Sequence, residues 1–109
     1  MGNQKLAAAL LAISLLLLLG CQERVGGRVH RVEMKASGFA PAELAAAPGD
    51  TVVWANHDIV PHTATAERRQ FDSGSVSPGA EWSLVVREPG RIPNTCTFHP
   101  TMKAVLVVK

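Results

Sequence analysis

The chain has 109 residues, of which 47% are hydrophobic and 18% are charged, so it is long enough for one small domain with a single core. Its formal net charge is +2, and its basic residues are scattered apart from the pair Arg68-Arg69, which we expect to lie in a solvated turn. This distribution of charge gives no support to nucleic-acid binding.

Residues 1–20 are predicted to be an export signal. Lys5 supplies a positive charge, and Leu6–Leu19 is then apolar except for Ser14. This apolar run is shorter than the roughly 20 residues with which a helix spans a bilayer. We therefore interpret the segment as a signal peptide, with Ala7–Leu19 as its helix, and not as a membrane-spanning anchor.

The end of this signal, Leu18-Leu19-Gly20-Cys21, resembles a bacterial lipobox. The resemblance implies cleavage before Cys21 and attachment of lipid to its sulfur and amino group, with residues 21–27 as a short lipid-anchored tether. An ordinary signal that is cleaved nearby and leaves Cys21 free is the alternative. We accordingly expect a protein of the bacterial cell envelope, on the periplasmic or extracytoplasmic side and attached to a membrane.

Residues 28–109 are predicted to form one all-β domain, a sandwich of two sheets. Alternating and β-branched stretches are separated by turn signals such as Pro48-Gly49-Asp50, Ser77-Pro78-Gly79 and Glu88-Pro89-Gly90. About seven short strands at this spacing, with no helix beyond a single turn at Glu67–Phe71, are typical of a β-sandwich. The expected strands are Arg28–Ala36, Glu43–Ala47, Thr51–Ala55, Pro61–Ala66, Glu81–Val86, Arg91–Thr95 and Ala104–Val108.

Several single residues carry structural expectations within these strands. Trp54, Trp82 and Met34 stand at strand positions and are predicted to be core residues. His30 is expected to face solvent near the start of the domain. Pro93 lacks a backbone donor, so its strand is expected at a sheet edge or with a bulge.

The residues with distinctive chemistry are concentrated in Cys96-Thr97-Phe98-His99-Pro100-Thr101-Met102. This segment offers a thiolate, an imidazole and a thioether at three-residue intervals, which a tight loop before the last strand can direct at one centre. A second imidazole, His62, follows Pro61 upstream. Two imidazoles, one thiolate and a weak axial thioether form a type 1 copper site, whereas zinc prefers more thiolates or carboxylate and water ligands. The predicted ligands of one copper ion per chain are His62, Cys96, His99 and Met102.

In these residues the chain resembles the cupredoxins, within them the amicyanin, pseudoazurin and plastocyanin group. The resemblance runs from about Val32 to Lys109, and the spacing of the Cys96–Met102 loop is most similar to that of amicyanin. Further matching motifs are Gly38-Phe39-Ala40-Pro41, Pro48-Gly49-Asp50-Thr51-Val52, Trp54-Ala55-Asn56, Pro61-His62-Thr63 and Phe71-Asp72-Ser73-Gly74.

The resemblance implies a two-sheet Greek-key sandwich with copper at one end. It further implies that His99 reaches the surface through an apolar patch and passes the electron, and Pro61, Phe98 and Pro100 are the candidates for that patch. The resemblance favours His62 over His57 as the upstream ligand.

The chain also departs from the pattern of the family. Thr63 stands where relatives often have an amide side chain, and we expect its hydroxyl to tie the two ligand loops together. The strand before Cys96 has no aromatic residue, and Ala104 replaces a common glycine. We expect backbone N–H groups near Asn56, Thr63 and Met102 to surround the copper ligands.

The predicted function is to carry single electrons between redox partner proteins, with the membrane as a further partner through Cys21 and with a monomeric chain. A copper chaperone or buffer is the alternative, although such proteins favour open Met-rich or His-rich sites and this chain has three methionines, including Met1 of the signal. An enzyme is not expected, because copper oxidases and nitrite reductases need further ligands and only His30 and His57 remain.

Overall fold

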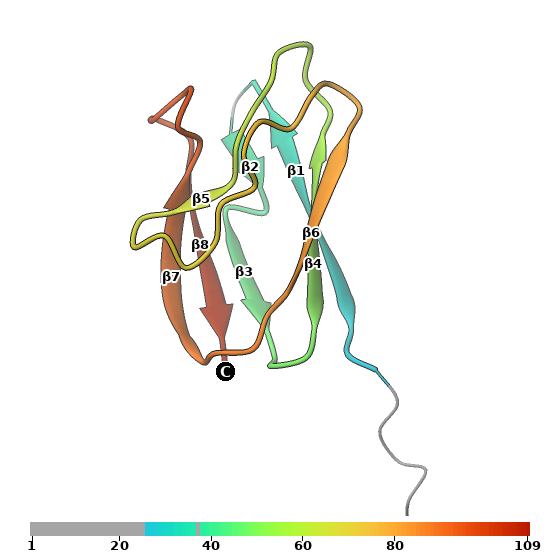
Figure 1. Ribbon diagram of the computed structural model, residues 1–109, viewed down its shortest axis with the longest axis vertical. Helices are drawn as coiled ribbons and strands as arrows, with labels where there is room; N and C mark the ends of the chain where they lie inside the picture. The colour runs from blue at the N-terminus through green and yellow to red at the C-terminus, as the bar shows by residue number, and fades with distance from the viewer. Residues whose placement is uncertain (1–25, 37) are drawn as a thin grey trace, which may run out of the picture.

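The computed structural model describes residues 26–36 and 38–109, so the predicted signal and the lipidated Cys21 lie outside the described residues. The described chain forms eight β-strands in two four-stranded sheets, which pack against each other as two layers (Figure 1). This arrangement confirms the predicted all-β sandwich of two sheets. No helix long and apolar enough to cross a membrane occurs among residues 26–36 and 38–109.

The first sheet has the strand order β2-β1-β4-β6. Its strands are β2 (Gly38–Ala40), β1 (Val29–Lys35), β4 (Thr51–Asn56) and β6 (Glu81–Val85). β1 runs parallel to β4, and the other two pairs are antiparallel. The prediction missed β2, because its three residues begin with Gly38 and directly precede Pro41, which are typical of turns. They form a strand through their pairing with the end of β1.

The second sheet has the strand order β3-β8-β7-β5. Its strands are β3 (Glu43–Ala46), β8 (Lys103–Val108), β7 (Gly90–Thr95) and β5 (Thr65–Ala66). β3 runs parallel to β8, and the other two pairs are antiparallel. β5 is much shorter than the predicted Pro61–Ala66, so most of that segment is a loop.

Pro93 was expected at a sheet edge or a bulge, and both expectations are wrong. It lies in β7, between β8 and β5, and the pairing of β7 with β8 continues through Pro93 without a bulge. The Pro93 carbonyl accepts a hydrogen bond from Glu67 N at 2.9 Å, on the side of β5. The N and C=O of one residue in a strand point to the same side, so the missing donor faces the short β5 and leaves the pairing with β8 intact. β5 pairs with Thr95 and Asn94 and ends before it reaches Pro93.

The core between the sheets is built around Trp54, which is 2% exposed. Its ring centroid lies 5.3 Å from that of Phe71 and 5.4 Å from that of Trp82. Met34 is fully buried, as predicted, whereas Trp82 on the edge strand β6 is only partly buried. Tilted aromatic pairs of this kind contribute roughly 0.5–1.5 kcal/mol each beyond the area they bury.

Asp50 holds together the segments at the end of the sandwich where β1 begins. Its Oδ1 accepts a hydrogen bond from Arg28 N at 2.9 Å, while its Oδ2 accepts from Ala47 N at 2.9 Å and lies 2.8 Å from His30 Nε2. The expectation that His30 faces solvent is therefore wrong, because its ring folds onto this carboxylate. Hydrogen bonds from Ala47 N–H, from His30 and from Arg28 N–H lower the pKa of Asp50 to about 2.

The Asp50→Asn variant is expected to be less stable than the wild-type protein, by an amount that depends on pH. Because the folded state lowers the pKa of Asp50 from 3.8 to about 2, its carboxylate stabilises the fold above pH 3.8, and this contribution is lost as the pH falls through about 2. Urea unfolding of both proteins between pH 2 and pH 6 measures the difference. A difference that stays constant over this range would contradict the assignment.

Candidate metal centre

Three of the predicted ligands lie in the loop that joins β7 to β8. Cys96 follows the last residue of β7 and is fully buried. The loop closes on itself, because Cys96 N donates to Met102 O at 3.2 Å, His99 N to Cys96 O at 3.3 Å and Met102 N to His99 O at 2.9 Å. These backbone bonds hold Cys96, His99 and the buried Met102 at the corners of one tight turn.

The fourth predicted ligand, His62, comes from the loop between β4 and β5. It forms an isolated bridge with Val76, in which Val76 N donates to His62 O at 2.8 Å and His62 N to Val76 O at 3.2 Å. Its residue is 1% exposed, so the ring lies inside the end of the sandwich. Of the strand expected at Pro61–Ala66, only Thr65–Ala66 forms. Ala64 N, just before it, donates to the Ser73 hydroxyl at 2.8 Å and not to a strand backbone.

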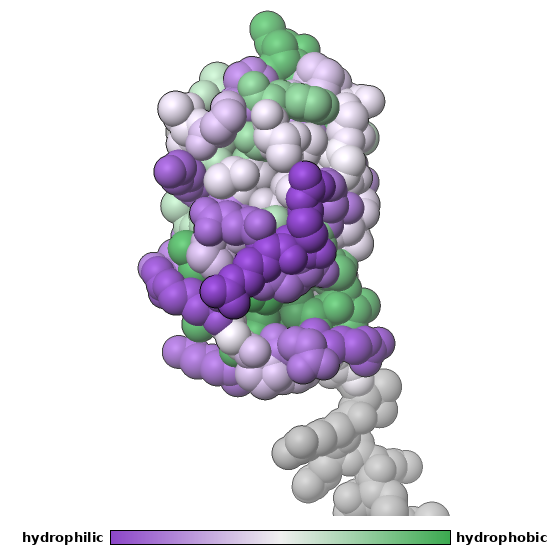
Figure 2. Space-filling view, turned by 60° about the vertical axis from the view of Figure 1, so that its left-hand side comes forward, coloured by the Kyte–Doolittle hydropathy of each residue, from purple (hydrophilic) through white to green (hydrophobic). Residues whose placement is uncertain are grey.

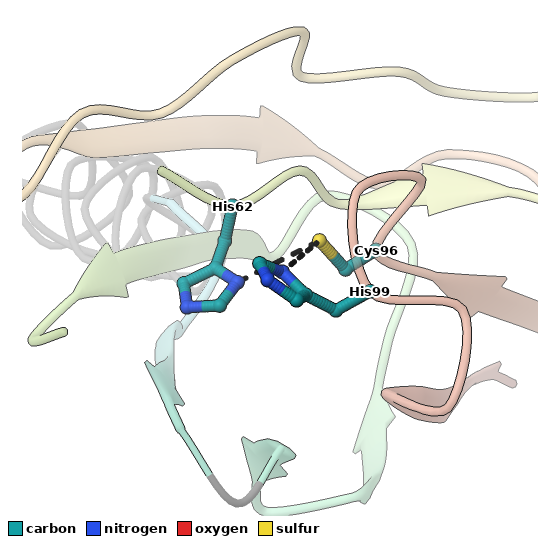
Figure 3. Close-up of side chains that lie close together, drawn as sticks. All are labelled: His62, Cys96 and His99. Atoms are coloured by element: carbon teal, nitrogen blue, oxygen red, sulfur yellow. Dashed lines mark hydrogen bonds between the residues drawn. The ribbon is translucent and has the colours of Figure 1, made fainter. Parts of the chain in front are cut away.

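The two segments bring the side chains of His62, Cys96 and His99 together (Figure 3). The loops that carry them lie at the same end of the sandwich (Figure 1). Cys96 Sγ lies 3.6 Å from His62 Nδ1 and 3.8 Å from His99 Nδ1, and the three ligand atoms all lie within 4.8 Å of one another. Donor atoms bound tetrahedrally to one metal at about 2.0–2.3 Å are about 3.6 Å apart. The observed spacing therefore fits a single metal ion.

His57, the rival upstream ligand, does not join this group. Its ring is exposed, and its Nε2 lies 3.9 Å from Glu33 Oε1. The structure thus brings His62, and not His57, to Cys96 and His99.

The surroundings of Cys96 favour its thiolate. Thr63 N donates to Cys96 Sγ at 3.3 Å. Burial by itself raises the pKa of the Cys96 thiol, but hydrogen bonds from Thr63 N–H and Phe98 N–H and the nearby rings of His62 and His99 outweigh it and lower the pKa to about 6. The thiol therefore ionises readily near neutral pH, which is the state that binds a metal.

Thr63 also joins the two ligand loops through its hydroxyl. Thr63 Oγ1 accepts a hydrogen bond from Thr97 N at 2.8 Å and lies 3.1 Å from Thr97 Oγ1. Thr65 Oγ1 lies 3.0 Å away on the other side. Thr63 thus supplies the link expected of it. Of the N–H groups expected around the ligands, Thr63 N bonds to the Cys96 sulfur, and Met102 N bonds to the carbonyl of His99 within its own loop.

Two residues behind His62 were not singled out as side-chain partners from the sequence. Asp58 Oδ2 lies 2.8 Å from His62 Nε2, the ring nitrogen that faces away from Cys96. Asn56 acts through its side-chain amide, which donates to Val60 O and Val76 O at 2.9 Å each. An Asp four residues before a ligand His is visible in the sequence, but in a loop this spacing does not determine where the carboxylate points.

The metal centre lies beneath an apolar surface. His99 is exposed, and the candidate patch residues Pro61, Phe98 and Pro100 are exposed as well. The structure adds Ile59, which is 91% exposed and was not named from the sequence. Figure 2 shows hydrophobic side chains gathered at this upper end of the molecule.

The donor set fits copper better than zinc. A buried thiolate, two imidazoles and a buried methionine in the same loop combine the soft and intermediate ligands that both oxidation states of copper accept. Zinc makes little use of a thioether, and no carboxylate belongs to the three-residue group. His62, Cys96, His99 and Met102 would hold the ion, which supplies a one-electron couple between Cu(I) and Cu(II) when bound.

The Thr63→Val variant is expected to lower the free energy of unfolding of the copper-free protein by about 1–2 kcal/mol, because Thr97 N–H loses its acceptor. Urea denaturation measures this change, and Thr63→Ser, which keeps the hydroxyl, serves as the control. Equal stability of the valine variant and the wild-type protein would show that the hydroxyl does not join the loops.

Comparison with known proteins agrees with this fold and donor set. Residues 7–108 match the family model of the cupredoxin-like domain. Among solved structures, the chain is similar to a Cu(I) form of an amicyanin in which a methionine is replaced by alanine. The two chains are 26% identical, with a TM-score of 0.67, and the match covers 82% of this chain and 88% of that chain. A search of curated proteins gave no significant match.

Two further solved structures share the fold. A purple cupredoxin from Nitrosopumilus maritimus is 24% identical, with a TM-score of 0.69 and coverage of 73% of this chain and 99% of that chain. A Cu-containing nitrite reductase from Thermus scotoductus SA-01 is also 24% identical, with a TM-score of 0.69, but the match covers 80% of this chain and only 23% of that chain. With a family model that spans nearly the whole sequence and a donor set suited to type 1 copper, the chain belongs to the cupredoxin family.

Proposed function

We propose that this cupredoxin carries single electrons between redox partner proteins through one type 1 copper. The observation that carries the proposal is the arrangement of His62, Cys96 and His99, which the fold holds within 4.8 Å of one another. Two backbone-closed loops fix these ligands and share a hydroxyl link. A ligand set held in this way changes little between Cu(I) and Cu(II), so the transferred electron causes little rearrangement.

The exposed His99 is the proposed exit for the electron. His62 and Cys96 are buried, so His99 is the ligand of this group that a partner protein can approach most closely. The exposed apolar residues around it can exclude water from such an encounter, and Phe98 is 52% exposed. We define the partner patch as Ile59, Pro61, Phe98 and Pro100, of which Ile59 is added from the structure.

Catalysis by this chain alone is not part of the proposed function. The similarity to a copper nitrite reductase extends over 23% of that protein, so most of the enzyme has no counterpart in the match. The two other described histidines are separate from the copper ligands, since His30 bonds to Asp50 and His57 lies near Glu33.

A copper chaperone or buffer remains the alternative function. Proteins that exchange copper need ligands that the solvent and a partner can reach. Here Cys96 is fully buried, Met102 is 5% exposed and the other described methionine, Met34, belongs to the core. The closed centre favours electron transfer over exchange of the metal.

We further propose that the protein works as a monomer attached by a lipid on Cys21 to a membrane of the bacterial cell envelope, on its periplasmic or extracytoplasmic side. The described chain starts at the end of the sandwich opposite the metal centre (Figure 1). An anchor attached there would leave the partner patch directed away from the point of attachment. Mass spectrometry of the mature protein from a bacterial host tests the lipid on Cys21.

The copper-loaded protein is expected to show an intense visible absorption band and a type 1 EPR spectrum. Both features depend on the bond between copper and the Cys96 thiolate, so Cys96→Ser should abolish them. His57→Ala is the control, because His57 lies outside the ligand group, and it should leave both spectra unchanged. Retention of the band in Cys96→Ser would remove Cys96 from the centre.

The copper-loaded protein is also expected to cycle reversibly between Cu(II) and Cu(I) in voltammetry, and to lose copper slowly to a competing chelator. Both results follow from the buried and preorganised ligands. A colourless site from which the chelator removes copper rapidly would contradict the carrier function and would favour the chaperone or buffer.

A further inference from the structure

The hydrogen bond between Asp58 and His62 joins a carboxylate to a buried residue of the proposed copper site. His62 Nε2 lies 2.8 Å from Asp58 Oδ2, and the two side chains are 2% and 11% exposed. The carboxylate therefore contacts the ring nitrogen that remains when Nδ1 faces Cys96 Sγ. Little solvent separates or screens the two groups.

Backbone hydrogen bonds orient the Asp58 carboxylate. Asp58 N donates to Asn56 Oδ1 at 2.9 Å, and Ile59 N donates to Asp58 Oδ1 at 2.7 Å. The Asn56 amide is itself held by the carbonyls of Val60 and Val76. With Oδ1 occupied by Ile59 N–H, Oδ2 is the oxygen directed at His62.

This contact selects one tautomer of His62. A neutral imidazole carries one proton, and an ionised carboxylate accepts hydrogen bonds but does not donate them. The proton therefore resides on Nε2, which leaves the lone pair of Nδ1 directed at the position between His62 and Cys96. Nδ1 is then ready to bind a metal without a proton first moving between the ring nitrogens.

The same contact places a negative charge next to a copper ligand. The oxidised ion carries one more positive charge than the reduced ion, so a nearby anion stabilises Cu(II) more than Cu(I). The effect is larger for a mostly buried carboxylate than for an exposed one, because water and salt screen it less. A carboxylate also makes the ring a stronger electron donor to the metal than a neutral acceptor would.

We propose that Asp58 is a positioning residue of the copper centre, which fixes the metal-binding tautomer of His62 and lowers the reduction potential of the bound copper. This inference rests on the proposed function of electron transfer and names a residue that sets its driving force. Asp58 acts through His62 and is not a ligand, since the ligand group contains His62, Cys96 and His99.

The first test compares the reduction potentials of the copper-loaded wild-type protein, Asp58→Asn and Glu33→Gln. Asp58→Asn keeps the shape of the side chain and an acceptor oxygen but removes the charge, so the potential should shift to a more positive value while the visible band persists. Glu33→Gln removes the same charge from an exposed carboxylate that contacts His57 and Lys35, and it should shift the potential less. Equal shifts in the two variants, or none in Asp58→Asn, would overturn the assignment.

The second test uses nitrogen-15 NMR of the histidine rings in the copper-free protein. The wild-type protein should show His62 with its proton on Nε2, and Asp58→Ala should show a mixture of the two tautomers. An unchanged tautomer in Asp58→Ala would overturn the positioning role. This readout does not require redox activity, so it separates an error about Asp58 from an error about the proposed electron transfer.

Discussion

The link between Thr63 and the loop from Cys96 to Met102 is the interaction on which the metal centre depends. His62 and Cys96 lie 34 positions apart in the chain and in separate loops. Thr63, next to His62, donates its N–H to the Cys96 sulfur and receives the N–H of Thr97 at its hydroxyl. These bonds join the two loops and place the imidazole beside the thiolate.

The scaffold makes this link possible by supporting each loop from the sheets. β4 ends at the fully buried Asn56, whose amide holds the loop that leads to His62. β7 and β8 remain paired up to Thr95 and Lys103, so their connection is short and closes on itself. At the other end of the sandwich, the Asp50 carboxylate forms hydrogen bonds to Arg28 N and His30 at the start of β1. Polar side chains thus fix both ends, while Trp54 and its aromatic neighbours fill the centre.

The strand pattern could be predicted where burial and pairing agree with the local sequence. Thr51–Asn56 and Lys103–Val108 are β-branched and apolar, and both form strands close to the expected bounds. The prediction failed where other partners satisfy the backbone. Ala64 N bonds to a serine hydroxyl, so the segment after His62 is mostly a loop, and Gly38–Ala40 becomes a strand only because β1 extends beside it.

The sequence by itself determined the donor types of the centre, because a cysteine, a histidine and a methionine at three-residue spacing must share one short loop. It also determined the sandwich class, since strand patterns and Pro/Gly turns are local features. Only the tertiary structure decided that His62 and not His57 faces Cys96, that Thr63 joins the loops and that Asp58 lies behind the His62 ring. These contacts depend on side-chain directions in loops, which the packing of distant segments determines and which residue spacing alone does not.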